Sequence, residues 1–122
     1  MPFANKFFKR ILITDNYEGL EPFYTRVFPS WDFAVQPVSA GRQWATIDPG
    51  IGPGGMVMSP AKLEPHGWLP YVLVESIHNT ILTAMANGGT VVVPERELPG
   101  GGTFAIIADP DENRIGIYQE RE

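Results

Sequence analysis

The chain has 122 residues, with 43% hydrophobic and 19% charged residues, which is typical of a single globular domain. Its net charge of −5 argues against nucleic-acid binding, and the absence of cysteine excludes disulfides, thiolate metal sites and cysteine nucleophiles. No apolar run approaches the roughly 18 residues of a membrane span, and the basic start of the chain lacks the apolar core of a signal peptide. We therefore expect a cytoplasmic protein.

The first half of the chain predicts a strand, a helix and three further strands. A strand is expected over residues 7–14, closed by Asp15-Asn16. Apolar residues at helical spacing follow, with Pro22 expected in the first turn of the helix and Pro29 at its end. The three later strands are expected at residues 31–36, 43–47 and 55–58.

The second half predicts the same order of elements. A strand over 69–74 precedes Ser76, a suitable N-cap for a helix that Gly88-Gly89 would end. Further strands are expected at 91–94, 103–108 and 115–118, with an Asp-Pro turn over 109–113.

Individual residues repeat at nearly one offset, which indicates a duplicated module. Four pairs occupy matching places: Asp48-Pro49 with Asp109-Pro110, Gly55 with Gly116 and Asp15 with Ser76, all at 61 residues, and Trp44-Ala45 with Phe104-Ala105 at 60. We therefore predict two βαβββ modules, residues 6–58 and 68–119, joined by a linker over 59–67 within a single domain over 1–122.

Four segments carry a resemblance to a known family. They are Pro22-Phe23-Tyr24 with Phe28-Pro29-Ser30-Trp31, then Trp68 to Glu75, Ala86 to Val91, and Ala108 to Tyr118. Together they resemble the vicinal oxygen chelate superfamily of glyoxalases, bleomycin-resistance proteins and extradiol dioxygenases, in particular its short glyoxalase-like branch. The resemblance implies an α+β, glyoxalase-like fold in which two tandem βαβββ modules form a curled mixed sheet around a cleft. It also implies a homodimer.

Metal-binding members of this superfamily place their ligands on the first and last strand of each module. The resemblance carries those places to Phe8, Gly55, Leu69 and Gly116, none of which can bind a divalent metal through its side chain. We therefore expect no metal and no other cofactor.

The alternation of side chains along strands predicts which residues face the cleft. The residues expected to line it are Phe8, Arg10, Leu12, Trp44, Gly55, Val57, Leu69, Tyr71, Gly116 and Tyr118. The opposite face, expected beneath helices, holds Ile11, Ile13, Met56, Met58, Val72, Val74, Ile115 and Ile117. Packing in the core or a dimer interface explains Trp44 and Tyr71 equally well. For Arg10 a solvated or salt-bridged side chain is slightly favoured over one that binds an anionic group.

Three other patterns favour structural over chemical roles. Gly50, Gly52 and Gly55 match G-x-G-x-x-G, but a strand rather than a helix is predicted after them. Asp109 begins a calcium-like spacing, but Arg114 stands where such a loop needs glycine. The two histidines, His66 and His78, lack metal-pair spacing, and no serine or threonine has the sequence context of a nucleophile.

The leading hypothesis from the sequence is a metal-free protein that binds a small organic ligand, similar to bleomycin-resistance members. One alternative is a metal-dependent lyase, isomerase or dioxygenase of the same superfamily with relocated ligands, such as Glu75 or Asp48. The other is a non-catalytic partner or structural subunit. Neither nucleic acid nor a membrane is an expected partner.

Overall fold

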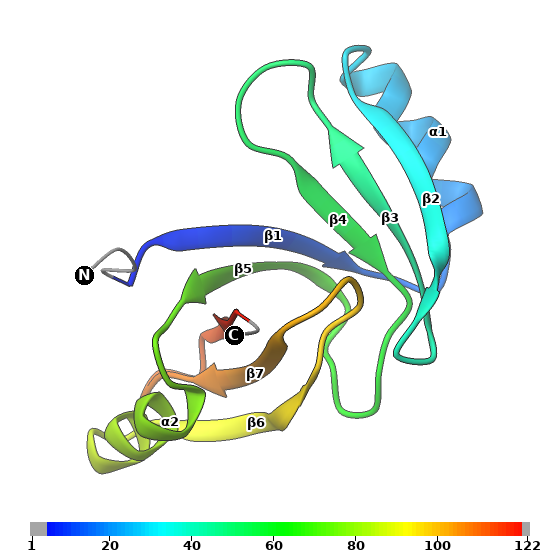
Figure 1. Ribbon diagram of the computed structural model, residues 1–122. Coiled ribbons are helices and arrows are strands. Elements are labelled where there is room, and N and C mark those ends of the chain that lie inside the picture. Colours follow the sequence, from blue (N-terminus) through cyan, green and yellow to red (C-terminus); the bar gives the residue numbers. More distant parts are fainter. Residues whose placement is uncertain (1–4, 121–122) are drawn as a thin grey trace.

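The computed structural model describes residues 5–120, which form two α-helices and one open sheet of eight strands (Figure 1). The first half contains β1 (Phe7–Ile13), α1 (Tyr17–Val27), β2 (Asp32–Ser39), β3 (Arg42–Asp48) and β4 (Gly55–Met58). The second contains β5 (Gly67–Leu73), α2 (Ile77–Ala86), β6 (Thr90–Glu97), β7 (Thr103–Ala108) and β8 (Arg114–Gln119). Neither helix has the length and apolar character needed to cross a bilayer.

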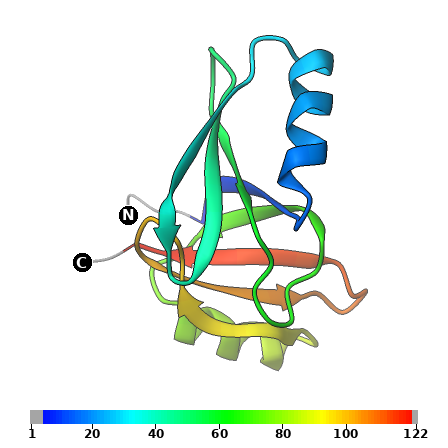
Figure 2. The ribbon, with the colours of Figure 1, turned by 90° about the vertical axis from the view of Figure 1, so that its right-hand side faces the viewer.

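The two halves join edge to edge into a single mixed sheet with the strand order β2-β3-β4-β1-β5-β8-β7-β6. β1 runs parallel to β4 and antiparallel to β5, while β5 runs parallel to β8. The sheet curls, with α1 outside the first half and α2 outside the second (Figures 1 and 2). The predicted α+β, glyoxalase-like fold is confirmed.

Both helices lie near the predicted places, and α2 also has the predicted ends. Ser76 caps α2, since its Oγ accepts a hydrogen bond from the Asn79 amide at 3.1 Å. Gly88 has a φ of 91° just after α2, the left-handed conformation that a helix C-terminus favours. α1 differs from the prediction because it begins at Tyr17, so Pro22 lies inside the helix rather than in its first turn.

Two strands run past their predicted ends at residues 36 and 94 and contain a proline. β2 includes Pro37 and β6 includes Pro94. Both are the outermost strands of the sheet, where a proline without an amide hydrogen need not break a ladder on its solvent side. Each proline therefore lies within an edge strand.

Buried side chains form a layer inside the curl of the sheet and a second layer beneath the helices. The inner cluster is Ile11, Ile13, Met56, Met58, Leu69, Tyr71, Leu73, Val93, Leu98, Phe104, Ile106 and Tyr118. Beneath α2 lie Val74, Ile77, Ala105 and Ile117. Beneath α1 lie Leu12, Ile47 and Val57, covered by Tyr17, Leu20 and Tyr24.

These clusters correct the predicted faces of the first half. Leu12 and Val57, expected in the cleft, pack beneath α1. Ile11, Ile13, Met56 and Met58, expected beneath a helix, belong to the inner cluster instead. In the second half Tyr71 and Tyr118 do face inward, and Val74 and Ile117 lie beneath α2, as expected.

The error has a physical cause in the length of the repeat. Phe7 and Gly67, which begin β1 and β5, are 60 positions apart, as are Tyr17 and Ile77, which begin the helices. Because neighbouring side chains on a strand point to opposite faces, a change of one residue in the assumed repeat reverses every face. The offset of 61 came from matched residues at and after the ends of strands, whereas the first strands and the helices of the two halves begin 60 residues apart.

Candidate ligand-binding cavity

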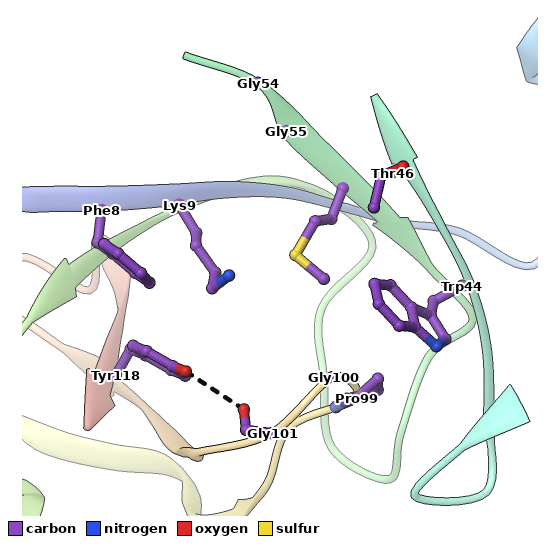
Figure 3. A pocket seen from close by; sticks show the side chains of 11 residues that line it. Phe8, Lys9, Trp44, Thr46, Gly54, Gly55, Pro99, Gly100, Gly101 and Tyr118 are labelled. Carbon is purple, nitrogen blue, oxygen red and sulfur yellow. Dashed lines mark hydrogen bonds between the residues drawn. The ribbon is translucent and has the colours of Figure 1, made fainter. Parts of the chain in front are cut away.

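A cavity of about 360 Å³ lies between the two halves of the molecule (Figure 3). One wall comes from β1, β3 and β4, and the other from β8 and the loop between β6 and β7. Its lining residues are Phe8, Lys9, Trp44, Thr46, Gly54, Gly55, Met56, Pro99, Gly100, Gly101 and Tyr118. Most of this surface is apolar, and three aromatic rings contribute to it.

Two of these rings are stacked across the join between the halves. The centroids of Phe8 on β1 and Tyr118 on β8 are 5.0 Å apart, and the ring planes differ by 10°. The Tyr118 hydroxyl donates a hydrogen bond to the carbonyl oxygen of Gly101 at 3.3 Å. The stack thereby holds one end of the cavity to the β6–β7 loop.

Trp44 forms the opposite end of the cavity (Figure 3). Its Nε1 donates a hydrogen bond to the Pro37 carbonyl at 2.9 Å, which fixes the plane of the indole. Gly100 packs against the ring so closely that a Cβ there would come within 3.2 Å of it. The Gly100 amide also donates to Ser39 Oγ at 3.3 Å, so the β6–β7 loop contacts the β2–β3 hairpin directly.

Lys9 extends from β1 into the cavity (Figure 3). Its Nζ lies 4.8 Å from the Phe8 ring centroid and 5.3 Å from that of Tyr118, within cation–π range of both. Burial lowers the pKa of the Lys9 ammonium, and the negative charge of Glu120 raises it in part. Lys9 is the one charged side chain among the lining residues.

The sequence prediction missed Lys9 because it placed this residue on the far face of β1. Between Phe7 and Lys9 the pairing of β1 with β5 shifts, so that β1 advances by two residues while β5 advances by one. Such a bulge brings both Phe8 and Lys9 to the cavity. No residue type in this stretch of the sequence marks the bulge.

The structure brings together four of the ten residues predicted for the cleft, namely Phe8, Trp44, Gly55 and Tyr118. The other six lie elsewhere. Leu69, Tyr71 and Gly116 are buried in the sheet, where a Cβ on Gly116 would clash with the Tyr71 ring. Leu12 and Val57 lie beneath α1. Arg10 points to the outer side of β1 and donates to the Gly54 carbonyl at 3.4 Å.

A buried ion pair between Arg42 and Glu64 is a further feature that the sequence did not indicate. Arg42 NH1 donates to Glu64 Oε2 at 3.1 Å, and its Nε donates to the Ser59 carbonyl at 3.0 Å. The Tyr71 hydroxyl is the buried side-chain polar group without a hydrogen-bond partner among the described residues, and burial raises its pKa. These groups do not line the cavity between the two halves.

A larger hollow of about 560 Å³ lies on the helix side of the first half, beside the start of α1. It is lined by the polar residues that precede and begin α1, together with β2 and β3. Asp15 and Glu18 give its rim a negative character. It lies within the first half, whereas the smaller cavity joins the two halves.

The described residues do not fit a divalent metal ion. No group of three or more His, Asp or Glu side chains in residues 5–120 is arranged to hold one. The four places that the resemblance implied, Phe8, Gly55, Leu69 and Gly116, have no metal-binding side chain, and neither do Lys9 and Met56, their neighbours on the cavity wall. The calcium-like loop at Asp109 is a turn, because this carboxylate accepts hydrogen bonds from the Asp111 and Asn113 amides.

No family model matches the chain. The chain is similar to "Putative glyoxylase CFP32" from Mycobacterium bovis, with 28% identity over 100 residues covering 81% of this chain and 38% of that protein. This chain therefore spans little more than a third of the length of that curated relative.

Among solved structures, a hypothetical protein from Bacillus halodurans matches with a TM-score of 0.71 and 16% identity, covering 98% of this chain and 96% of that one. A glyoxalase/bleomycin resistance protein/dioxygenase superfamily member from Vibrio splendidus matches with a TM-score of 0.55 and 13% identity, covering 94% of this chain and 100% of that one. The chain shares the fold of these two solved structures. This likeness agrees with the resemblance noted in the sequence, and the cavity lies between the two halves of that fold.

Proposed function

We propose that the chain binds a small organic molecule in the cavity between its two halves, without a metal ion. The observation that carries this proposal is the cavity itself, with three aromatic rings, Met56 and Pro99 around a single charged group. Small-molecule sites are mostly apolar hollows of roughly 300–1,000 Å³ with a few polar groups that orient the ligand. A volume of about 360 Å³ lies at the small end of that range.

The walls of the cavity are held in place before any ligand arrives. Trp44 is fixed by its hydrogen bond to Pro37 and by its contact with Gly100, and Tyr118 is fixed by its stack on Phe8. A preformed site spends little binding free energy on ordering its own side chains. This supports a site for binding rather than an incidental gap in the packing.

The relative's name suggests a glyoxylase, and a metal-dependent lyase, isomerase or dioxygenase remains the rival function. That chemistry would need metal ligands moved from the usual places. The two proposed substitutes, Glu75 and Asp48, are exposed and do not line the cavity, and Asp48 Oδ1 accepts a hydrogen bond from the Gly50 amide at 2.8 Å. This arrangement favours metal-independent binding.

Binding is tested with a panel of small aromatic and aliphatic compounds, screened by isothermal titration calorimetry. We expect saturable binding by wild type that Thr46→Trp abolishes, because Thr46 lines the cavity and a tryptophan there would fill it. Thr83→Trp makes the same substitution on the exposed surface of α2 and should leave binding unchanged. Binding that survives Thr46→Trp, or no saturable binding at all, would contradict the proposal.

The role of metal is tested on the same protein. Elemental analysis after purification without a metal-chelating tag should find no stoichiometric transition metal, and a chelator should leave ligand affinity unchanged. One bound metal per chain would favour the enzymatic alternative. The homodimer that the resemblance implies is also proposed, and sedimentation velocity tests it.

A further inference from the structure

We propose that Lys9 makes the cavity selective for an organic anion, specifically a small monocarboxylate with a flat, apolar body. The inference rests on the proposed function and adds the chemical class of the ligand. Its basis is the position of one cationic side chain among aromatic walls (Figure 3).

The Lys9 ammonium has unused hydrogen-bonding capacity. An ammonium carries three donors and no acceptor. Among residues 5–120 no acceptor lies within hydrogen-bond or ion-pair distance of Nζ, which faces the Phe8 and Tyr118 rings instead. A half-buried cation with unmet donors gains most from a ligand that brings a charged oxygen.

The sign of the charge inside the cavity is opposite to that of the whole chain. The chain carries a net charge of −5, but no acidic residue lines this cavity. Glu120, the charged residue whose field acts on Lys9, is exposed and lies outside the lining. A cationic ligand would be repelled at Nζ, and a neutral one would leave the ammonium without a counter-charge.

The remaining walls determine the body of the ligand. Phe8 and Tyr118 lie beside Nζ, while Trp44 closes the far end and Met56 lines the floor between them. Flat rings and a thioether favour stacking and dispersion contacts over hydrogen bonds. A carboxylate held at Nζ would therefore direct its apolar body towards Trp44.

Matched pairs of acids and their neutral amides test this inference. The probes are trans-cinnamate with cinnamamide, 2-naphthoate with 2-naphthamide, and indole-3-acetate with indole-3-acetamide, titrated by calorimetry at neutral pH. We expect at least one carboxylate to bind about tenfold or more tightly than its amide, the size of one charge-assisted hydrogen bond.

Three variants locate the source of the preference. Lys9→Met keeps the length of the side chain, removes its charge and should abolish the preference for the acid. Lys9→Arg should retain it. Lys62→Met changes the net charge equally at an exposed site outside the cavity lining and should behave as wild type.

The outcomes separate this inference from the proposed function. Equal affinity for acid and amide, or a preference that survives Lys9→Met, overturns the anion selectivity while the binding function stands. If no acid or amide binds wild type with a Kd below about 10 mM, the inference fails, and the proposed function fails with it only if the wider panel also shows no saturable binding.

Discussion

Phe8 and Tyr118 stack on each other although β1 and β8 are separated in the sheet by β5. The contact follows from the curl of the sheet, which brings the inner faces of these two strands together. It joins the first strand of one half to the last strand of the other. The cavity opens beside this stack, so its shape depends on the curl.

Replacing the two stacked rings should reveal a coupling between the halves. Phe8→Leu and Tyr118→Leu should each lower the free energy of unfolding, and the double mutant should lose less than the sum by about 0.5–1.5 kcal/mol. Urea denaturation of the four proteins measures this. Strictly additive losses would show that the stack does not hold the halves together.

Gly116 should tolerate no side chain. A Cβ there would meet the ring of Tyr71, which is fully buried and cannot move aside. We expect Gly116→Ala to lower the free energy of unfolding by about 1–3 kcal/mol through overpacking. Tyr71→Leu in the same chain should relieve part of that loss, and a double-mutant cycle by urea denaturation would detect it. If Gly116→Ala left the free energy of unfolding unchanged, Gly116 and the Tyr71 ring would have to lie further apart than the structure places them.

Breaking the Arg42–Glu64 pair should destabilise the chain strongly. Both side chains are buried, with 6% and 0% of their surface exposed, so removing one partner leaves an uncompensated charge. Glu64→Gln should cost about 3–5 kcal/mol in urea denaturation. Glu120→Gln, at an exposed site, serves as the control and should cost far less. The pair would be dispensable if the two variants unfolded at similar urea concentrations.

Because of Lys9, raising the pH into the alkaline range should increase the free energy of unfolding and lower the affinity for carboxylates. Because burial lowers its pKa from 10.5, the folded state loses the Lys9 proton at a lower pH than the unfolded state does. The free-energy cost of burying the ammonium is fully present below the folded-state pKa and disappears as the pH rises to about 10.5. Over that pH window, wild type should therefore gain stability relative to Lys9→Met.

Carboxylate affinity should fall over the same window, since the ammonium is lost. Urea denaturation and calorimetry across this range test both trends, with Lys62→Met correcting for the general effect of net charge. Two trends that run in the same direction would contradict the assigned role of Lys9.

The order of the elements could be predicted from the sequence because local signals determine it. Ser76 and Gly88 mark the ends of α2, and β4 has the predicted bounds. The inner faces of β5 and β8 were also correct, since these two strands pair without a register shift from Tyr71 to Tyr118.

The first half of the site could not be predicted, because the register of a strand depends on its partners in the sheet. The bulge before Lys9 is visible only in the pairing of β1 with β5. The 60-residue spacing of the two modules likewise becomes clear only when the partners of β1 in the sheet are known. The β6–β7 loop likewise reaches the cavity only through contacts with Trp44 and Ser39. The positions of Lys9 and of the β6–β7 loop in the cavity wall therefore depend on contacts between distant segments, which the local sequence does not indicate.

The site of binding can be located directly by methionine-methyl NMR. Met56 lines the cavity, whereas Met85 lies exposed on α2, so each ε-methyl reports on a different surface. Titration with the tightest carboxylate should shift the Met56 signal saturably and leave that of Met85 in place, and Lys9→Met should weaken the shift. A saturable ligand that leaves the Met56 signal unchanged would contradict binding in the cavity between the two halves.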